Sequence, residues 1–241
     1  MPRQPLKTMT YLANRQFKQN RAGRDFVVGD IHGEFSLFEH SLQLLNFDTK
    51  KDRVFSVGDL IDRGPESARV REFLESGWFY SILGNHELMA LDAATDCDTL
   101  HAWTHTNGGA WWLDIPPQEQ AHYLAAFKAL PLTLEVDTAL GSVGLVHANV
   151  PFSFSWQELV TRVAEDDLLR ANILWSRQRF HRRYTNTVAG IDWVFCGHTP
   201  TEQITQLGNV FYVDTGACYG GGLTIFPLDQ LPVIPIHKAL A

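Results

Sequence analysis

Residues 25–33 of the chain read Asp25-Phe26-Val27-Val28-Gly29-Asp30-Ile31-His32-Gly33, and the fold prediction starts from this segment. Its apolar run, Phe26 to Val28, predicts a buried strand that stops at a glycine. Asp30 and His32 follow, and alternation along an extended chain places them on the same side. Ligands of open α/β sheets bind beyond the carboxyl ends of the strands, so this pair could hold a metal ion. A strand-to-helix turn with Asp30 as the helix cap explains the stretch as well, and the stretch alone leaves both interpretations open.

The pattern of strand, glycine, polar residues and helix occurs three times in the first half of the chain. Strands predicted at 53–57 and 78–83 repeat the design of the first. Such units imply a largely parallel sheet with right-handed crossovers. Further strands are predicted at 132–136, 142–146, 191–196, 210–213 and 223–226, and helices at 34–45, 65–76, 85–94, 118–130 and 155–174.

The chain shows no internal repeat, low-complexity linker or composition break that would mark a domain boundary. We therefore expect one α/β domain over residues 1–241, with 1–23 as an N-terminal extension and 99–115 as an insert that could form a lid over the site. Trp103, Trp111 and Trp112 in this insert are expected to pack in the core or in the lid rather than to bind a ligand.

Composition limits the possible partners and compartments. A formal net charge of -7 and a pI near 5.8 argue against non-specific binding to nucleic acid or to an anionic membrane, which needs a basic surface. Three widely spaced cysteines form neither a zinc-ribbon pattern nor an even disulfide framework, which favours a reducing cytoplasm. No segment has the roughly 20 apolar residues of a membrane span, and the first 20 residues lack the apolar stretch of a secretory signal.

Polar residues able to bind a metal ion or a phosphate follow apolar runs at five places. The preference of such residues for turns and helix caps does not explain five occurrences. They are Asp30 with His32, Asp59 with Asp62 and Arg63, Asn85 with His86, His147, and His198. Six of these residues form an oxygen and nitrogen ligand set that favours manganese, iron or zinc over calcium: Asp30, His32, Asp59, Asn85, His147 and His198. Six ligands are too many for one catalytic ion but suit two ions that share a carboxylate, for which Asp59 is the best candidate.

Three segments resemble the signature blocks of the phosphoprotein phosphatases, the PPP type of serine/threonine phosphatase within the calcineurin-like metallophosphoesterases. They are Gly29–Gly33, Gly58–Gly64 and Gly84–Glu87. The resemblance continues at Val146–Ala148, Trp175–Arg177, Gly197–Pro200 and Asp214–Ala217, and it is strongest to the compact bacterial and phage branch. It implies a central β-sandwich of mixed sheets flanked by helices.

The resemblance also implies a role for each site residue. Asp30, His32 and Asp59 would hold one ion, and Asp59, Asn85, His147 and His198 the second, most simply as two manganese ions with iron or zinc as alternatives. His86 would be the general acid and Asp62 would orient it. Arg63 and Arg177 would bind the phosphate, with Arg179, Arg182 and Arg183 nearby as alternatives to Arg177. Glu87 is expected to stabilise the start of its helix.

The implied reaction is hydrolysis of phosphoserine and phosphothreonine, with phosphotyrosine as a further substrate, by direct attack of a metal-bridging hydroxide. The expected partner is thus a phosphoprotein or phosphopeptide. Two alternatives remain: a diadenosine tetraphosphate hydrolase, whose family shares these blocks, and a non-catalytic phosphate-binding scaffold. The presence of all six ligands and His86 disfavours the scaffold, while chain length and the Trp175-Ser176-Arg177 stretch favour the protein phosphatase.

Overall fold

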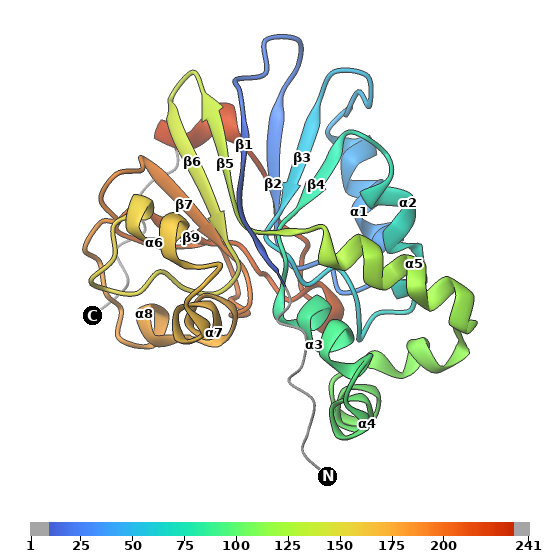
Figure 1. The fold of residues 1–241 in the computed structure, drawn as a ribbon. Helices are drawn as coiled ribbons and strands as arrows, with labels where there is room; N and C mark the ends of the chain where they lie inside the picture. The colour runs from blue at the N-terminus through green and yellow to red at the C-terminus, as the bar shows by residue number, and fades with distance from the viewer. Residues whose placement is uncertain (1–9, 234–241) are drawn as a thin grey trace.

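Two β-sheets pack against each other at the centre of the molecule (Figure 1). The computed structural model describes residues 10–233. One sheet has four strands in the order β10 (Ile225–Pro227), β2 (Asp25–Val28), β3 (Arg53–Ser56) and β4 (Phe79–Ser81). In this sheet β2, β3 and β4 are parallel and β10 is antiparallel.

The second sheet has six strands and is also mixed. Its order is β1 (Leu12–Phe17), β5 (Pro131–Thr138), β6 (Gly141–Val146), β7 (Trp193–Cys196), β9 (Val210–Tyr212) and β8 (Thr205–Leu207). The hairpin β5–β6 and the pair β8–β9 are antiparallel, while the other pairs are parallel. The predicted fold class, a sandwich of mixed sheets flanked by helices, is confirmed.

The continuous apolar run of β2 follows from burial on both of its faces. Val27 packs in the core between the two sheets, where Phe55 of β3 and Phe195 of β7 also lie. Phe26 and Val28 point the other way, into the core beneath the helices. Phe26, Val27 and Val28 are thus all apolar because the strand has a core on each of its two faces.

Helices flank the sandwich on its two outer sides (Figure 1). The four-stranded sheet is flanked by α1 (Phe35–Leu44), α2 (Val70–Leu74) and α5 (Pro117–Lys128), and the other sheet by α6 (Trp156–Arg162), α7 (Asp167–Trp175) and α8 (Gln178–His181). At the lower end lie α3 (Asn85–Ala93) and α4 (Cys97–Thr106). Short 3-10 helices are η1 (Ser67–Arg69), η2 (Gly109–Asp114), η3 (Ala217–Tyr219) and η4 (Leu228–Val233). Within residues 10–233 no helix is long and apolar enough to cross a bilayer.

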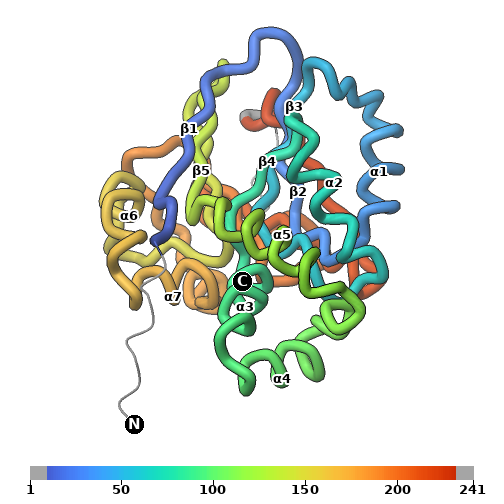
Figure 2. Tube along the Cα trace, turned by 45° about the vertical axis from the view of Figure 1, so that its right-hand side comes forward, coloured from blue at the N-terminus to red at the C-terminus, as the bar shows by residue number. Residues whose placement is uncertain are grey.

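Strand β1 was not predicted, although it lies within the expected N-terminal extension. It runs parallel to β5, with Leu12 opposite Pro131 and Phe17 opposite Val136, and the two strands lie side by side in Figure 2. Its sequence, LANRQF, lacks apolar alternation because the strand lies at a sheet edge with several of its side chains exposed. Pairing with a distant strand, rather than local pattern, makes this segment extended.

The prediction of one helix over 155–174 was wrong, because the segment forms two helices, α6 and α7. Ser155 caps α6 in a capping box with Glu158, and Asp166 caps α7 by accepting a hydrogen bond from the N–H of Leu169 at 2.9 Å. The acidic middle of the segment therefore contains a helix start. The helix predicted at 65–76 is also shorter, as η1 followed by α2.

Candidate metal centre and phosphate site

The carboxyl ends of five strands bring the predicted ligands to one place. Asp30 and His32 follow β2, Asp59 follows β3, Asn85 follows β4, His147 follows β6, and His198 follows β7. Each of the six side chains is at most 6% exposed. Both sheets contribute, so the cluster lies where the two sheets of the sandwich meet.

Asp59 lies between two groups of histidines. Its Oδ2 atom is 3.7 Å from Nε2 of His32, and its Oδ1 atom is 3.4 Å from Nε2 of His147. Two sets of possible ligand atoms share this aspartate: one adds His32 and His86, and the other adds His147 and His198. This central position is the one that a bridging carboxylate requires. By distance alone His86 belongs to the first set, where the sequence analysis expected Asp30.

Backbone carbonyls fix which nitrogen of each histidine faces the centre. Nδ1 of His32 lies 2.8 Å from the carbonyl oxygen of Ile61, and Nδ1 of His147 lies 2.7 Å from that of Val57. Because a carbonyl can only accept, Nδ1 carries the proton in both rings and a neutral ring presents the lone pair of Nε2. His198 is turned the other way, since its Nε2 lies 3.2 Å from the carbonyl of Trp175.

Asn85 completes a set of electron-pair donors. Its Oδ1 atom is 2.8 Å from Nε2 of His147 and 2.8 Å from Nδ1 of His198. In neutral rings with the protons placed as above, the amide oxygen of Asn85 thus contacts two ring nitrogens that are also electron-pair donors. A cation between them would turn this repulsion into coordination, so the arrangement fits a metal ion.

Asp30 supplies a second sign of a cation site. Its Oδ2 atom accepts the N–H of His198 at 2.9 Å, but its Oδ1 atom is buried without a hydrogen-bond partner among the described residues. Such an orphaned oxygen is costly unless something pairs with it. Burial, with the carboxylates of Asp214 and Asp59 nearby, raises the pKa of Asp30 well above its usual range. Divalent ions would relieve this crowding of negative charge.

The electrostatics leave most of the candidate ligands able to donate electron pairs. Burial lowers the pKa of His32 and of His198 to about 3, so both rings are neutral near pH 7. Burial alone would raise the pKa of Asp59, but His147, whose own pKa the Asp59 carboxylate raises, and His86 hold the pKa of Asp59 well below its usual range. Neutral imidazoles and an ionised carboxylate are the forms that bind metal.

The backbone is unusual at the same residues. Among the described residues seven positions other than glycine have positive φ, and five of them lie in the candidate site. They are His32 (46°), Asp59 (52°), Asp62 (76°), Arg63 (68°) and His198 (65°). Left-handed conformations cost these residue types roughly 1–3 kcal/mol each and persist where function or packing demands them. The concentration of such residues in one region supports its choice as the candidate functional site.

Glu87 has a larger part than the sequence analysis expected. Its side chain is fully buried and accepts the N–H of Gly84 at 2.9 Å, which is the predicted contact at the start of α3. It also accepts the N–H groups of Asp59 at 3.0 Å and Leu60 at 2.8 Å, so it holds the loop of the central ligand. Gly84 must be a glycine here, because a Cβ atom would lie 2.3 Å from Asp59.

His86 and Asp62 form a buried pair beside the cluster. Nδ1 of His86 is 2.6 Å from Oδ2 of Asp62, and the two side chains are 1% and 0% exposed. The backbone N–H of His86 donates to Oδ1 of Asp59 at 3.0 Å, which ties the pair to the ligand set. An imidazole whose Nδ1 proton is held by a carboxylate has Nε2 available for proton transfer.

Two exposed arginines lie at the edge of the cluster. Arg63 points Nη1 at Nε2 of His32, and its guanidinium lies 5.5 Å from the ring centre of Tyr219. Arg177 donates from Nη2 to the carbonyl oxygen of His198 at 3.0 Å. Both predicted phosphate-binding arginines are thus beside candidate ligands. Arg179 is unsuitable as an alternative, since it is 1% exposed and donates to the carbonyls of Val150, Tyr184 and Asn186.

Asp214 is a buried carboxylate to which the sequence analysis gave no role. It follows β9 at the same end of the sheet and accepts the N–H of Gly216 at 3.0 Å. Burial raises its pKa, and the Asp59 carboxylate adds to the effect. The sequence signal that could have identified Asp214 is its position just after an apolar strand, which it shares with the candidate ligands.

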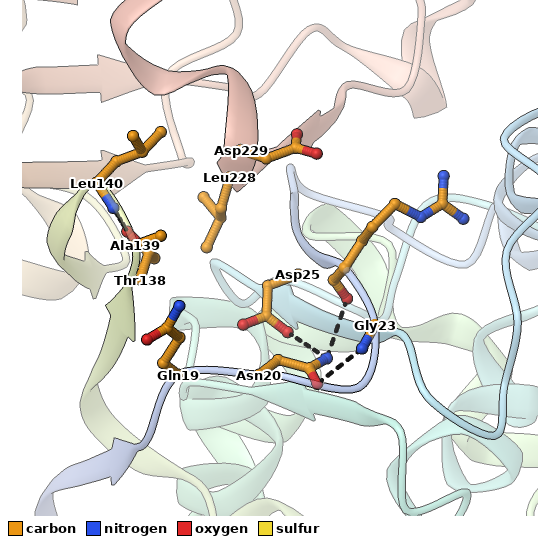
Figure 3. Close-up of a pocket in the computed structure, with 10 residues that line it drawn as sticks. Gln19, Asn20, Gly23, Asp25, Thr138, Ala139, Leu140, Leu228 and Asp229 are labelled. Atoms are coloured by element: carbon orange, nitrogen blue, oxygen red, sulfur yellow. Dashed lines mark hydrogen bonds between the residues drawn. The ribbon is translucent and has the colours of Figure 1, made fainter.

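A separate hollow of about 230 Å³ lies near the start of β2 and the β5–β6 turn, at the end of the strands away from the ligands (Figure 3). The side chain of Asn20, which lines this hollow, is used in structural contacts: it donates to the carbonyl of Lys51 at 2.8 Å and accepts the N–H of Ala22 at 3.0 Å. The hollow has no part in the chemistry described above.

Comparison with known proteins defines the class to which this fold and site belong. The model of the calcineurin-like phosphoesterase family matches residues 26–202. The chain belongs to this family, as the sequence resemblance indicated, and it is a phosphoesterase, a hydrolase.

Individual relatives refine this assignment. Serine/threonine-protein phosphatase 1 of Salmonella typhimurium is 40% identical over 205 residues, covering 83% of this chain and 89% of that protein. A bis(5'-nucleosyl)-tetraphosphatase of Geobacillus is 26% identical over 238 residues, covering 89% and 94%. Among solved structures, a cold-active protein-tyrosine phosphatase of Shewanella shares the fold with a TM-score of 0.63 at 16% identity, over 90% of this chain and 78% of that one. The chain is thus more similar in sequence to the protein phosphatase of Salmonella than to the tetraphosphatase of Geobacillus.

Proposed function

We propose that this chain is a metal-dependent phosphoprotein phosphatase that hydrolyses phosphoserine and phosphothreonine, with phosphotyrosine as a further substrate class. The observation that carries the proposal is the 2.6 Å contact between His86 and Asp62 at the edge of the ligand cluster. The leaving group of a serine or threonine phosphate is an alkoxide, which needs a proton. A buried, oriented imidazole is the group that would supply it.

Two divalent ions fit the donor set, with manganese as the first candidate and iron or zinc as alternatives. Asp30, His32 and Asp59 would hold one ion, and Asp59, Asn85, His147 and His198 would hold the other. Such ions supply Lewis-acid charge and make a water molecule acidic enough to act as the nucleophile. The protein contributes the shared carboxylate and the fixed histidine tautomers.

The remaining side chains act on the phosphate ester. His86 would donate its Nε2 proton to the leaving oxygen, while Asp62 holds the Nδ1 proton and stabilises the cationic ring. Arg63 and Arg177 would bind the phosphate oxygens, since a guanidinium offers two parallel donors where a lysine offers one point charge. No cysteine or serine of the chain is required as a nucleophile.

Substrate comparison tests the proposal. Metal-stripped protein reloaded with manganese should turn over a phosphoserine peptide with a higher kcat/KM than diadenosine tetraphosphate. A strong preference for the dinucleotide would instead support the second candidate, a dinucleoside tetraphosphate hydrolase, which the 26% identical tetraphosphatase keeps open. Binding of phosphate without turnover of either compound would support a non-catalytic scaffold.

The finer assignments of partner, domain and compartment belong to the same proposal. The partner is a phosphoprotein or phosphopeptide substrate, and the compartment is the cytoplasm, for which the free cysteines argue. Residues 1–241 would act as one metallophosphatase domain, in which residues 99–115 border the catalytic pair.

A further inference from the structure

Two tryptophans of the 99–115 insert make hydrogen bonds to Asp62. The indole N–H of Trp103 donates to Oδ2 at 2.5 Å, and that of Trp111 donates to Oδ1 at 2.7 Å. Since Nδ1 of His86 also lies 2.6 Å from Oδ2, the carboxylate has three side-chain partners, one on Oδ1 and two on Oδ2. The tryptophans therefore do more than pack in a core or a lid.

This insert is fixed to the site by its backbone as well. The carbonyl of Gly108 accepts the N–H of Arg63 at 3.3 Å. Gly109 lies against the ring of Trp103, so closely that a Cβ atom would be 2.5 Å from it. Gly108 has a φ of 88°, which glycine adopts without strain. The glycine pair thus lets the turn approach both Arg63 and Trp103.

The chemistry of indole suits this position. Asp62 is fully buried, and a buried carboxylate requires hydrogen-bond donors. An indole N–H can only donate and does not titrate, so it cannot compete with His86 for the proton in transfer. A large ring packed among others is also rigid: Trp103 lies 5.5 Å from Trp112 and 6.4 Å from Trp111 between ring centres.

We propose that Trp103 and Trp111 are positioning residues that hold the carboxylate of Asp62 in the orientation that directs His86 toward the leaving group. The inference rests on the roles of His86 and Asp62 in the proposed function. The inference extends these roles, because the 99–115 insert then supports proton delivery by His86. Hydrolysis of substrates whose leaving group needs a proton should therefore depend on the two tryptophans, and hydrolysis of substrates with a good leaving group should not.

The test compares Trp103→Phe and Trp111→Phe with Trp112→Phe as the matched control. Trp112 is 4% exposed in the same ring cluster but has no hydrogen bond to Asp62 in the described structure. On a phosphoserine peptide the first two variants should lose kcat by about 10- to 100-fold, part of the ~10²–10⁴ that a general acid contributes, with KM unchanged. On p-nitrophenyl phosphate, whose leaving group needs no proton, the kcat of these two variants should stay close to that of the wild type. The control should match wild type on both substrates.

Equal losses on both substrates, or an equal loss in the control, would overturn the inference in favour of a structural role. If a phenylalanine variant fails to fold, β-(3-benzothienyl)alanine at position 103 or 111 keeps a fused bicyclic ring of nearly the same shape and replaces the N–H donor by sulfur, which cannot donate. The same selective loss is then expected, and retention of full activity on the phosphopeptide would contradict the proposal.

A measurement without substrate separates this inference from the proposed function. In ¹H–¹⁵N spectra the indole N–H signals of Trp103 and Trp111 should lie downfield of that of Trp112 and move upfield in Asp62→Asn. Unmoved signals would refute the hydrogen bonds. A wild-type protein that is inactive on phosphopeptides but has these shifts would contradict the proposed function, and with it the role in proton delivery, while leaving the contacts in place.

Discussion

Oδ2 of Asp62 accepts hydrogen bonds from both a titratable ring, His86 at 2.6 Å, and a non-titratable one, Trp103 at 2.5 Å. This relationship joins a loop after β3, the start of α3 and the insert that follows it. It separates His86 from the other histidines of the cluster, whose ring protons are held by backbone carbonyls. The difference in partner is the reason for proposing that His86 is a proton donor rather than a metal ligand.

Replacement of His86 by asparagine tests that distinction. The variant is expected to keep two ions per chain, measured by elemental analysis, and to lose turnover of a phosphoserine peptide by about 10²–10⁴-fold. His122→Asn, at an exposed histidine of α5, serves as the control and should retain both properties. Loss of metal in His86→Asn would make His86 a ligand and refute its role as the acid.

The proposed bridging role of Asp59 predicts a different outcome for its asparagine variant. An amide offers one neutral oxygen where the carboxylate offers two charged ones, so Asp59→Asn should weaken binding of both ions. Asp30→Asn is the comparator, since it is expected to weaken one ion only. Tight retention of two ions in Asp59→Asn, measured by calorimetric titration with manganese, counts against a shared carboxylate.

Glu87 predicts a stability effect away from substrate. Glutamine would place an NH₂ group against at least one of three backbone N–H donors, which should lower the free energy of unfolding by about 1–3 kcal/mol. Glu158 occupies the same capping position in α6 but is exposed, so Glu158→Gln should cost less than about 0.5 kcal/mol. Urea denaturation of the two variants measures the difference in the free energy of unfolding. Equal losses in the two variants would show that the hydrogen bonds of the buried Glu87 add no stability beyond those of an exposed cap.

Thiol labelling tests the environment of the cysteines. Cys97 is exposed, whereas burial raises the pKa of Cys196 to about 12, so Cys196 stays protonated and shielded at pH 8. Iodoacetamide should therefore modify Cys97 in the folded protein and reach Cys196 only on unfolding, as mass spectrometry of peptides can establish. Because the proposed reaction uses no thiol, labelling of Cys97 should leave activity unchanged. Rapid modification of Cys196 in the native state would contradict its burial.

That the candidate ligands lie together could be predicted from the sequence, because each of them follows a strand within a few residues. Local pattern is enough to find Asp30 or His198, and the sheet topology then brings them together. The hydrogen bonds from Trp103 and Trp111 to Asp62 could not be found in this way, because these tryptophans lie 41 and 49 residues further along the chain. Strand β1 was missed for the same reason, since only pairing with β5 makes it extended.

The roles assigned to the individual site residues are predictions, and they share one requirement, a centre of two ions on the shared carboxylate of Asp59. Manganese titration of the metal-stripped protein, with ions per chain and phosphopeptide turnover recorded on the same samples, tests it most directly. Two ions per chain are expected at saturation, with activity that appears as both metal sites fill. A protein that binds one ion or none, or that hydrolyses the phosphopeptide equally well after complete removal of metal, would contradict it.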